Sequence, residues 1–242
     1  MTTVSPAEIS RYNQLASTWW QADGPMWPLH KLNRLRLPYV MQGICRHFER
    51  DAEAPRPLAG LSVLDVGCGA GLLAEGLAGA GARVVGVDPA IKNIEIARDH
   101  AQAMMLDIDY RVGSIDAVGA DEMFDVVLNM EVVEHVESLP TFIAACCGHT
   151  QVGGLQFIAT INRTFFAWFA AIVGAEYVLR WLPRGTHQWR KFVTPRETQA
   201  MLASHGQRVV DWIGVKVNPL TRQYRLANVL SVNYMVTALR AF

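Results

Sequence analysis

The chain has 242 residues, and its 22 Lys and Arg balance its 22 Asp and Glu to a formal net charge of zero. Without a basic field to attract phosphates, we expect no nucleic acid among its partners. Its four cysteines include no C-x-x-C pair, which suits reduced thiols. The sequence has no signal-peptide core and no apolar run of about 18 residues, so we expect neither a secreted nor a membrane-spanning protein.

The first 50 residues are predicted to form an N-terminal helical cap, and residues 51–242 a core domain. Ser5-Pro6-Ala7-Glu8 has the pattern of a capping box with proline at the first helical position, which predicts a helix to about Trp19. A second helix is expected over the apolar series Leu32, Leu35, Val40, Met41, Ile44 and Phe48. Arg36 lies within this series, where its spacing alone fits a solvated or ion-paired arginine as well as a ligand contact.

The core alternates strands and helices after a proline-containing linker over residues 51–60. Strands are expected at 61–66, 82–87, 108–112, 123–129 and 154–161, and helices near 71–80, 90–104 and 138–149. This alternation predicts an α/β fold with a parallel sheet covered by helices on both faces. Ligands bind such sheets at the carboxyl ends of the strands, where Asp65, Asp88, Ser114 and Met130 fall.

The first core strand ends in a glycine turn formed by Gly67, Gly69 and Gly71. Glycines let backbone N–H groups approach a ligand at a helix N-terminus, so the turn predicts a nucleotide-type site. Asp65 stands just before the turn, where it would repel a pyrophosphate but attract an ammonium group. S-adenosylmethionine carries an ammonium group on its methionine end, and we expect it as the cofactor.

The second strand ends in Asp88, about 20 residues after the turn, where an acid suits the two hydroxyls of an adenosine ribose. A nicotinamide dinucleotide would use the same acid, so a nucleotide-dependent oxidoreductase stays as an alternative, against which Asp65 argues. The structural alternative for both acids is loop capping at strand ends.

A second informative stretch follows Met130. If the chain turns helical there, Glu131, Glu134 and His135 share one helix face at i, i+3, i+4 spacing. Methylation of a phenol requires the phenolate, which costs roughly 4 kcal/mol at pH 7. A general base or a divalent metal removes that cost.

Two catalytic assignments remain open for this stretch. His135, oriented by a glutamate such as Glu134, would serve as the base. Alternatively, Glu131, Glu134 and His135 would hold a hard cation such as Mg²⁺, which an ortho-diphenol could chelate, although histidine is unusual around Mg²⁺. The structural alternative is two surface acids and a histidine that caps a loop.

Residues 163–191 form an apolar block flanked by Arg163, Arg184, Arg190 and Lys191. The block is too short to span a bilayer and suits a helix at a membrane interface or a lid over an apolar substrate. Its candidate membrane or substrate-tail residues are Phe165, Phe166, Trp168 and Phe169. An ordinary core helix is the alternative.

The chain then shows a second capping box, Thr194-Pro195-Arg196-Glu197, which predicts a helix to about Ser204. A strand is expected over residues 209–217, and residues 228–240 are expected to be helical or extended. If residues 228–240 are extended, these elements make a seven-stranded, mostly parallel sheet.

Several motifs carry a resemblance to known families. Leu64-Asp-Val-Gly-Cys-Gly-Ala-Gly71 and Gly86-Val-Asp88 resemble motif I and its acidic partner in class I S-adenosylmethionine-dependent methyltransferases. The rest of the chain resembles the ubiquinone-biosynthesis O-methyltransferases, in the segments Ala16-Ser-Thr-Trp-Trp20, Pro28-Leu-His-Lys-Leu-Asn33, Glu131-Val-Val-Glu-His-Val136, Thr160-Ile-Asn-Arg-Thr164, Ile172-Val-Gly-Ala-Glu-Tyr177, Leu182-Pro-Arg-Gly-Thr-His187 and Val232-Asn-Tyr234.

The resemblance implies a Rossmann-like class I fold and two O-methylations, one of a polyprenyl catechol and one of a demethylubiquinol. It matches Arg36, Gly67, Asp88 and Met130 to cofactor-contacting positions, with Arg36 paired to the methionine carboxylate. It matches the Glu131, Glu134 and His135 set to a divalent metal found in some members. It also matches residues 163–191 to a segment that touches membrane lipid.

We therefore expect a peripheral enzyme on the cytoplasmic face of a bacterial membrane with anionic lipid, in contact with other ubiquinone-biosynthesis proteins. If a presequence has been removed, the mitochondrial matrix side is the alternative. Two rivals remain: a methyltransferase for a soluble phenol or carboxylic acid, and a cofactor-binding scaffold that acts only through partners.

Overall fold

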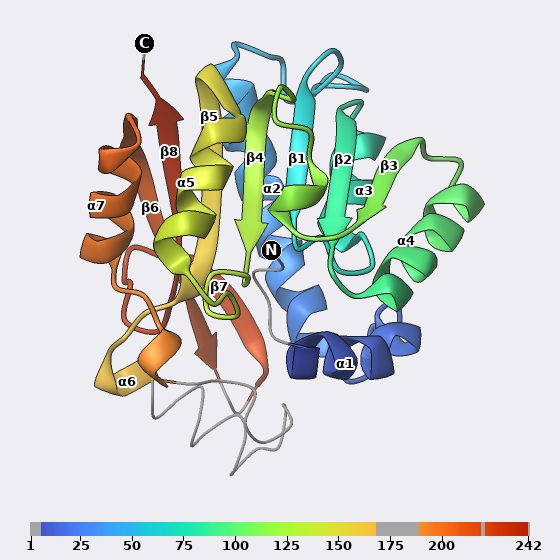
Figure 1. Cartoon of the computed structure of the whole chain (residues 1–242), viewed down its shortest axis with the longest axis horizontal. Coiled ribbons are helices and arrows are strands. Elements are labelled where there is room, and N and C mark those ends of the chain that lie inside the picture. Colours follow the sequence, from blue (N-terminus) through green and yellow to red (C-terminus); the bar gives the residue numbers. More distant parts are fainter. Residues whose placement is uncertain (1–5, 168–188, 219–220, 242) are drawn as a thin grey trace.

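A computed structural model describes residues 6–167, 189–218 and 221–241 of the chain. In this part of the chain, eight strands form one sheet in the order β3-β2-β1-β4-β5-β8-β6-β7 (Figure 1). The strands are β1 (Ser62–Val66), β2 (Arg83–Asp88), β3 (Ile108–Val112), β4 (Phe124–Met130), β5 (Thr150–Ile161), β6 (Gln207–Asn218), β7 (Gln223–Ala227) and β8 (Asn233–Arg240).

The sheet is parallel on one side and antiparallel on the other. Strands β3, β2, β1, β4 and β5 run parallel, with Val63 paired to both Val84 and Val126. β8 pairs antiparallel with β5 and with β6, and β6 forms an antiparallel hairpin with β7. The central strands β1 and β4 are mostly apolar and buried, because helices cover the sheet on both faces.

Helices of both layers close the core. The helices are α1 (Pro6–Leu15), α2 (Trp27–His47), α3 (Leu72–Gly79), α4 (Ile91–Ala103), α5 (Leu139–His149), α6 (Phe165–Ala167) and α7 (Pro195–Ser204), with short 3-10 turns η1 (Ala16–Thr18), η2 (Ile115–Ala117) and η4 (Trp189–Lys191). One apolar cluster joins α2, α3 and α4 to one face of the sheet. A second cluster joins α5 and α7 to the other face.

These elements confirm the α/β architecture with helices on both faces. The count of seven strands was wrong, because the described residues add an eighth, β7, at the sheet edge. The final stretch is the extended strand β8. The capping box at Thr194 is present, since its side chain and that of Glu197 each accept a backbone N–H of the other.

Other expectations are only partly tested by the described residues. Ser5, the first residue of the predicted N-terminal capping box, lies outside them, as does most of the 163–191 block. The division of the chain at about residue 50 stays a prediction. Among the described helices, none combines the length and apolar character needed to cross a membrane.

Candidate active site

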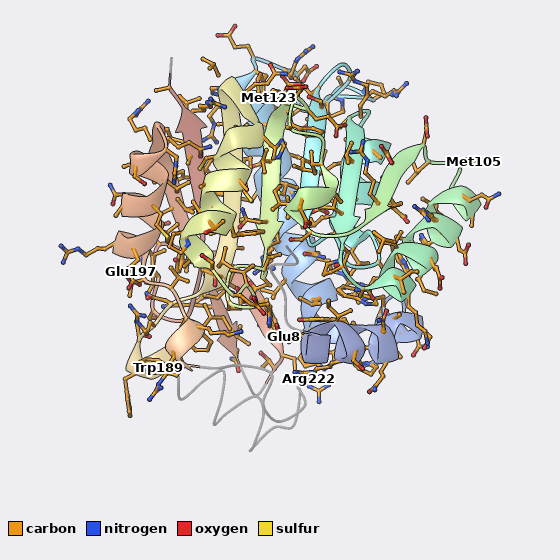
Figure 2. The ribbon with its side chains drawn as sticks, viewed as in Figure 1. Glu8, Met105, Met123, Trp189, Glu197 and Arg222 are labelled. Carbon is orange, nitrogen blue, oxygen red and sulfur yellow. The ribbon has the colours of Figure 1, made fainter. Side chains whose placement is uncertain are left out.

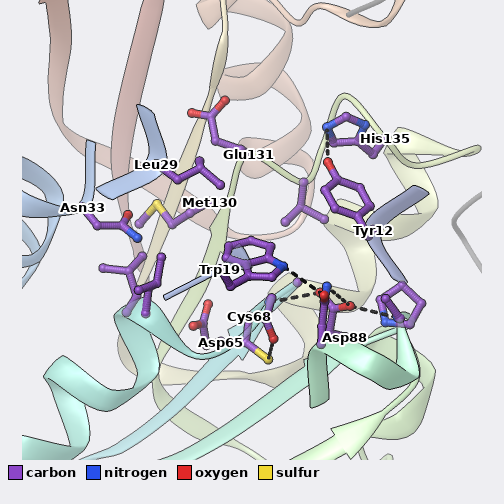
Figure 3. A pocket seen from close by; sticks show the side chains of 18 of the residues that line it. Tyr12, Trp19, Leu29, Asn33, Asp65, Cys68, Asp88, Met130, Glu131 and His135 are labelled. Atoms are coloured by element: carbon purple, nitrogen blue, oxygen red, sulfur yellow. Dashed lines mark hydrogen bonds between the residues drawn. The ribbon is translucent and has the colours of Figure 1, made fainter. Parts of the chain in front are cut away.

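A cavity of about 140 Å³ lies where β1, β2 and β4 end, and α1 with the segment after it covers that cavity (Figure 3). Arg36, Asp65, Asp88, Met130 and His135 are all part of its wall. The topology explains this meeting, because β1 lies between β2 and β4 and their carboxyl ends face the same side. The sequence prediction of a site at this edge is therefore supported by geometry.

The glycine turn brings backbone close to the cavity. Gly67 has φ +74°, and a Cβ there would lie 2.4 Å from a methyl group of Val132. Gly69 has φ +56°, and a Cβ there would lie 2.5 Å from the Trp19 ring. Both positions require glycine, because any side chain would be strained and would collide with a neighbour. The turn can thus hold a ligand against main-chain atoms.

Two buried acids stand beside this turn. Asp88 accepts hydrogen bonds from the backbone N–H of Gly69 at 3.0 Å and of Ala90 at 2.9 Å, and from the Asn93 amide at 3.1 Å. Burial nevertheless raises the pKa of Asp88 to about 6. Burial, together with the nearby charge of Asp88, raises the pKa of Asp65 to about 7. A cationic group placed next to Asp65 would relieve this unfavourable burial.

Trp19 and Asn93 complete the wall around Asp88. The indole N–H of Trp19 donates to the Asn93 carbonyl oxygen at 2.9 Å, and Asn93 in turn donates to Asp88. Figure 3 shows Trp19 among Asp65, Asp88 and Met130. The sequence prediction missed Asn93, although its position five residues after the strand-end acid was a usable signal.

Arg36 reaches the cavity from α2 and is only 1% exposed. Its guanidinium donates to the Glu131 carboxylate, which also accepts the Asn233 amide from β8 at 2.8 Å. Burial raises the pKa of Glu131, but the charge of Arg36 and the bond from Asn233 outweigh burial and hold the pKa below its usual value. Within the described residues, the buried Nε of Arg36 has no hydrogen-bond partner.

The chain does not turn helical after Met130, so Glu131, Glu134 and His135 do not share a helix face. Residues 131–137 form turns, and Glu131 has φ +60°, a backbone conformation that a right-handed helix excludes. The two glutamates lie next to each other: Glu131 also faces Arg36, and Glu134 also accepts the Thr160 hydroxyl at 2.8 Å. His135 instead faces α1. Figure 3 shows Glu131 and His135 directed to different sides of the cavity.

This arrangement does not suit a metal centre. In the described parts of the chain, no group of three or more His, Cys, Asp or Glu is arranged to hold a metal ion. Burial and the adjacent Glu131 carboxylate raise the pKa of Glu134. Each of the three side chains instead connects the turn to another element.

The remaining predicted residues fall in different places. Ser114 is buried at the start of η2 and is not part of the cavity wall. Phe165 is 72% exposed at the start of α6. The Phe166 side chain, Trp168 and Phe169 lie outside the described residues. The described structure therefore brings the cofactor candidates other than Ser114 together. Of the four predicted membrane or substrate-tail residues, Phe165 is the one whose side-chain exposure it describes.

Comparison with known proteins shows the family to which this chain belongs. Residues 64–158 match the model of a methyltransferase domain. A ubiquinone biosynthesis O-methyltransferase of Brucella anthropi is 51% identical over 240 residues, which cover 99% of this chain and 97% of the relative. The chain belongs to the ubiquinone biosynthesis O-methyltransferase family. Another member, from a Methylobacterium species, is 48% identical over 98% of this chain and 96% of its own.

Solved structures confirm the fold of this ubiquinone biosynthesis O-methyltransferase family member. The magnesium protoporphyrin IX methyltransferase of Synechocystis PCC 6803, solved with bound SAH, matches with a TM-score of 0.62 and 18% identity. The match covers 85% of this chain and 82% of that protein. The predicted class I S-adenosylmethionine-dependent methyltransferase fold is therefore confirmed, as is the predicted family.

Proposed function

We propose that this chain transfers the methyl group of S-adenosylmethionine to ring hydroxyls of polyprenylated catechol and demethylubiquinol, and so performs both O-methylations of ubiquinone biosynthesis. The curated relatives at about 50% identity support the pathway by their names. The observation that carries the chemistry is the pair of buried acids, Asp65 and Asp88, beside the glycine turn in one cavity with His135.

The cofactor would lie along the glycine turn. Asp88 would accept the ribose hydroxyls, and Asp65 would face the methionine ammonium group. Arg36 has an unpartnered Nε for the methionine carboxylate, while its other end stays fixed by Glu131. Gly67, Gly69 and Met130 would contact the cofactor directly. Ser114 is not part of the cavity wall, so any effect it has on the cofactor would be indirect. Bound there, S-adenosylmethionine supplies a methyl group on a sulfonium.

His135 would remove the proton of the acceptor hydroxyl, because its ring lines the same cavity as the glycine turn. Glu134 would not contact the acceptor directly, since its carboxyl is buried and accepts a hydrogen bond from Thr160. We propose no step through a divalent cation such as Mg²⁺, because no group of three His, Cys, Asp or Glu in the described residues is arranged to hold one. A chelator should therefore leave turnover unchanged.

The substrate tail implies a membrane encounter. The exposed Phe165 and α6 lie at the end of the molecule where the parallel strands end, which is also the end that carries α1 and the cavity (Figure 1). Figure 2 shows Glu8, Trp189 and Arg222 at that same end. The proposed location is the cytoplasmic face of a bacterial membrane with anionic lipid, near other ubiquinone-biosynthesis proteins, and the mitochondrial matrix side is the alternative.

Methyl transfer to defined acceptors tests the proposal. Radiolabelled S-adenosylmethionine is supplied with a short-tailed prenyl catechol, a short-tailed demethylubiquinol, or unprenylated catechol, each with and without chelator. We expect turnover of both prenylated acceptors and far slower turnover of the soluble one. Equal rates on all three acceptors would favour the rival that uses a soluble phenol. Cofactor binding without turnover on any acceptor would favour the scaffold.

A further inference from the structure

Helix α1 brings two side chains to the catalytic histidine. Glu8 and Tyr12 are one helical turn apart and therefore share a face of α1. The Glu8 carboxylate lies 2.9 Å from Nδ1 of His135, and the Tyr12 hydroxyl lies 3.4 Å from Nε2 of the same ring. The dashed line in Figure 3 joins Tyr12 to His135. Both ring nitrogens of His135 are thus engaged by the N-terminal cap.

The chemistry of these groups defines which nitrogen carries the proton. An ionised carboxylate only accepts hydrogen bonds, so Nδ1 of His135 must donate to Glu8. Nε2 then presents its lone pair, and the Tyr12 hydroxyl donates to it. Burial raises the pKa of Glu8, but the hydrogen bond and charge of His135 outweigh burial and hold it below its usual value. Arg11 and Lys191 add to this lowering.

The Tyr12 hydroxyl is a phenol at the place where a phenolic acceptor would meet the base. The Tyr12 ring packs edge-on against the imidazole, with centroids 5.9 Å apart. Burial and the nearby charge of Glu134 raise the pKa of Tyr12, so this phenol stays neutral. The raised pKa disfavours transfer of this proton to His135, so Tyr12 can hold the acceptor position without becoming the acceptor.

We propose that Glu8 is a positioning residue that orients His135 as the general base, and that the Tyr12 hydroxyl occupies the position that the acceptor hydroxyl takes during turnover. This inference rests on the proposed function, in which His135 is the base. The acceptor would displace Tyr12 from Nε2 while the Glu8–His135 pair stays in place. The cap would therefore supply part of the catalytic machinery.

An oxygen lone pair of the acceptor forms the bond to the methyl carbon, and the electron pair of the broken carbon–sulfur bond stays on sulfur. The acceptor proton moves to Nε2 of His135, and the resulting imidazolium is stabilised by the Glu8 carboxylate. Solvent then takes the proton, which restores the neutral ring.

Four variants, three of them in α1 and one at His135, and one matched control test the proposal on the full chain with a short-tailed prenyl catechol. Glu8→Gln should lower kcat on the order of 10- to 100-fold, because the ring loses its orienting charge. KM and the Kd for S-adenosylmethionine should stay within about twofold of the original values, and Glu8→Asp should recover part of kcat. Tyr12→Phe should lower KM about two- to tenfold, because one competing hydrogen bond is lost.

The matched control removes a second acid–imidazole pair. Glu75 lies 2.9 Å from Nδ1 of His100, outside the cavity wall, and His100 stacks on Trp20 of the cap segment. Glu75→Gln should keep kcat, which separates loss of orientation at His135 from general loosening of the cap. Equal losses in Glu75→Gln and Glu8→Gln would overturn the positioning role, as would a parallel loss of cofactor affinity in Glu8→Gln.

The outcomes also separate this inference from the proposed function. If His135→Ala keeps full turnover, the base assignment fails and the Glu8 inference fails with it. If His135→Ala loses turnover but Glu8→Gln stays within about twofold, only the positioning role fails. A rise of KM in Tyr12→Phe would make Tyr12 a substrate contact and overturn the placeholder role. Near-ultraviolet circular dichroism and cofactor calorimetry confirm that each variant is folded.

Discussion

At the scale of a single residue, the buried carboxyl of Asp65 lowers the stability of the folded protein while serving the proposed cofactor site. Its carboxyl is 2% exposed, and burial raises its pKa to about 7. Asp65→Asn should therefore stabilise the free protein at pH 8 by roughly 1–4 kcal/mol, since one pKa unit corresponds to about 1.36 kcal/mol. The same change should weaken cofactor binding. Chemical denaturation measures the stability, and calorimetry measures the cofactor affinity. A destabilised variant would contradict the view that the Asp65 carboxyl is unfavourable for folding.

The pH dependence of this effect has a defined sign. The folded-state pKa of Asp65 lies above its ordinary value of 3.8, so the folded state binds more protons than the unfolded state between about pH 4 and 7. The destabilising contribution of Asp65 thus grows as pH rises through that window and is constant above it. The difference in unfolding free energy between Asp65→Asn and the original chain should be near zero at pH 4 and largest above pH 7. A pH-independent difference would show that Asp65 is not the titrating group.

Arg36 and Glu131 form a buried pair whose separate loss should be visible in stability. Glu131→Gln leaves a guanidinium that is 1% exposed without its charge partner, which typically costs about 3–5 kcal/mol. If Arg36 also reaches the cofactor carboxylate, saturating S-adenosylmethionine should restore part of that loss. Thermal melting with and without cofactor checks this. An unchanged deficit would place the cofactor carboxylate elsewhere.

At the scale of elements, regular patterns were readable and long-range pairs were not. The apolar runs ending in Asp65 and Asp88 predicted β1, β2 and the site edge, because strand period and strand-end chemistry are local. The turn after Met130 could not be predicted in this way. Glu131 has a positive φ, and because it is not a glycine, nothing in the sequence marks that backbone conformation. Glu8 and His135 are 127 residues apart, and no spacing rule joins them.

The cap segment around η1 should move when the cofactor binds. The cavity of about 140 Å³ is smaller than the roughly 300–1,000 Å³ typical of small-molecule sites, and the Trp19 ring lies directly over Gly69. We expect S-adenosylmethionine to change tryptophan emission, and Trp19→Phe to remove most of that change. Trp212 on β6 lies outside the cavity wall and packs on Tyr234, so Trp212→Phe is the control. An equal change in both variants would argue that the cap stays fixed.

At the scale of the whole molecule, the antiparallel strands β8, β6 and β7 extend the parallel sheet and lie on the side that carries α6 and α7 (Figure 1). The eighth strand escaped prediction because Gln223–Ala227 has only 5 residues, and its pairing with β6 is what defines it. Edge strands of this kind are short and charged, which prevents pairing with other chains. One of these strands, β8, reaches the cofactor cavity through Asn233, which donates a hydrogen bond to Glu131 in the cavity wall.

The same end of the molecule carries the cavity and the exposed Phe165, so the approach to a membrane and the approach to the site should share one direction. Phe165→Asp together with Trp168→Asp should reduce co-sedimentation with anionic phosphatidylglycerol vesicles several-fold, because aromatic contact with the acyl boundary is replaced by repulsion from the lipid charge. Turnover of a long-tailed acceptor in vesicles should fall with binding, whereas turnover of a short-tailed acceptor in solution should not. Met105→Asp is the matched control, since Met105 is equally apolar and 92% exposed but lies at the other end of the molecule (Figure 2). Persistent co-sedimentation of the double variant, or an equal loss in the control, would remove the membrane-facing role of this end.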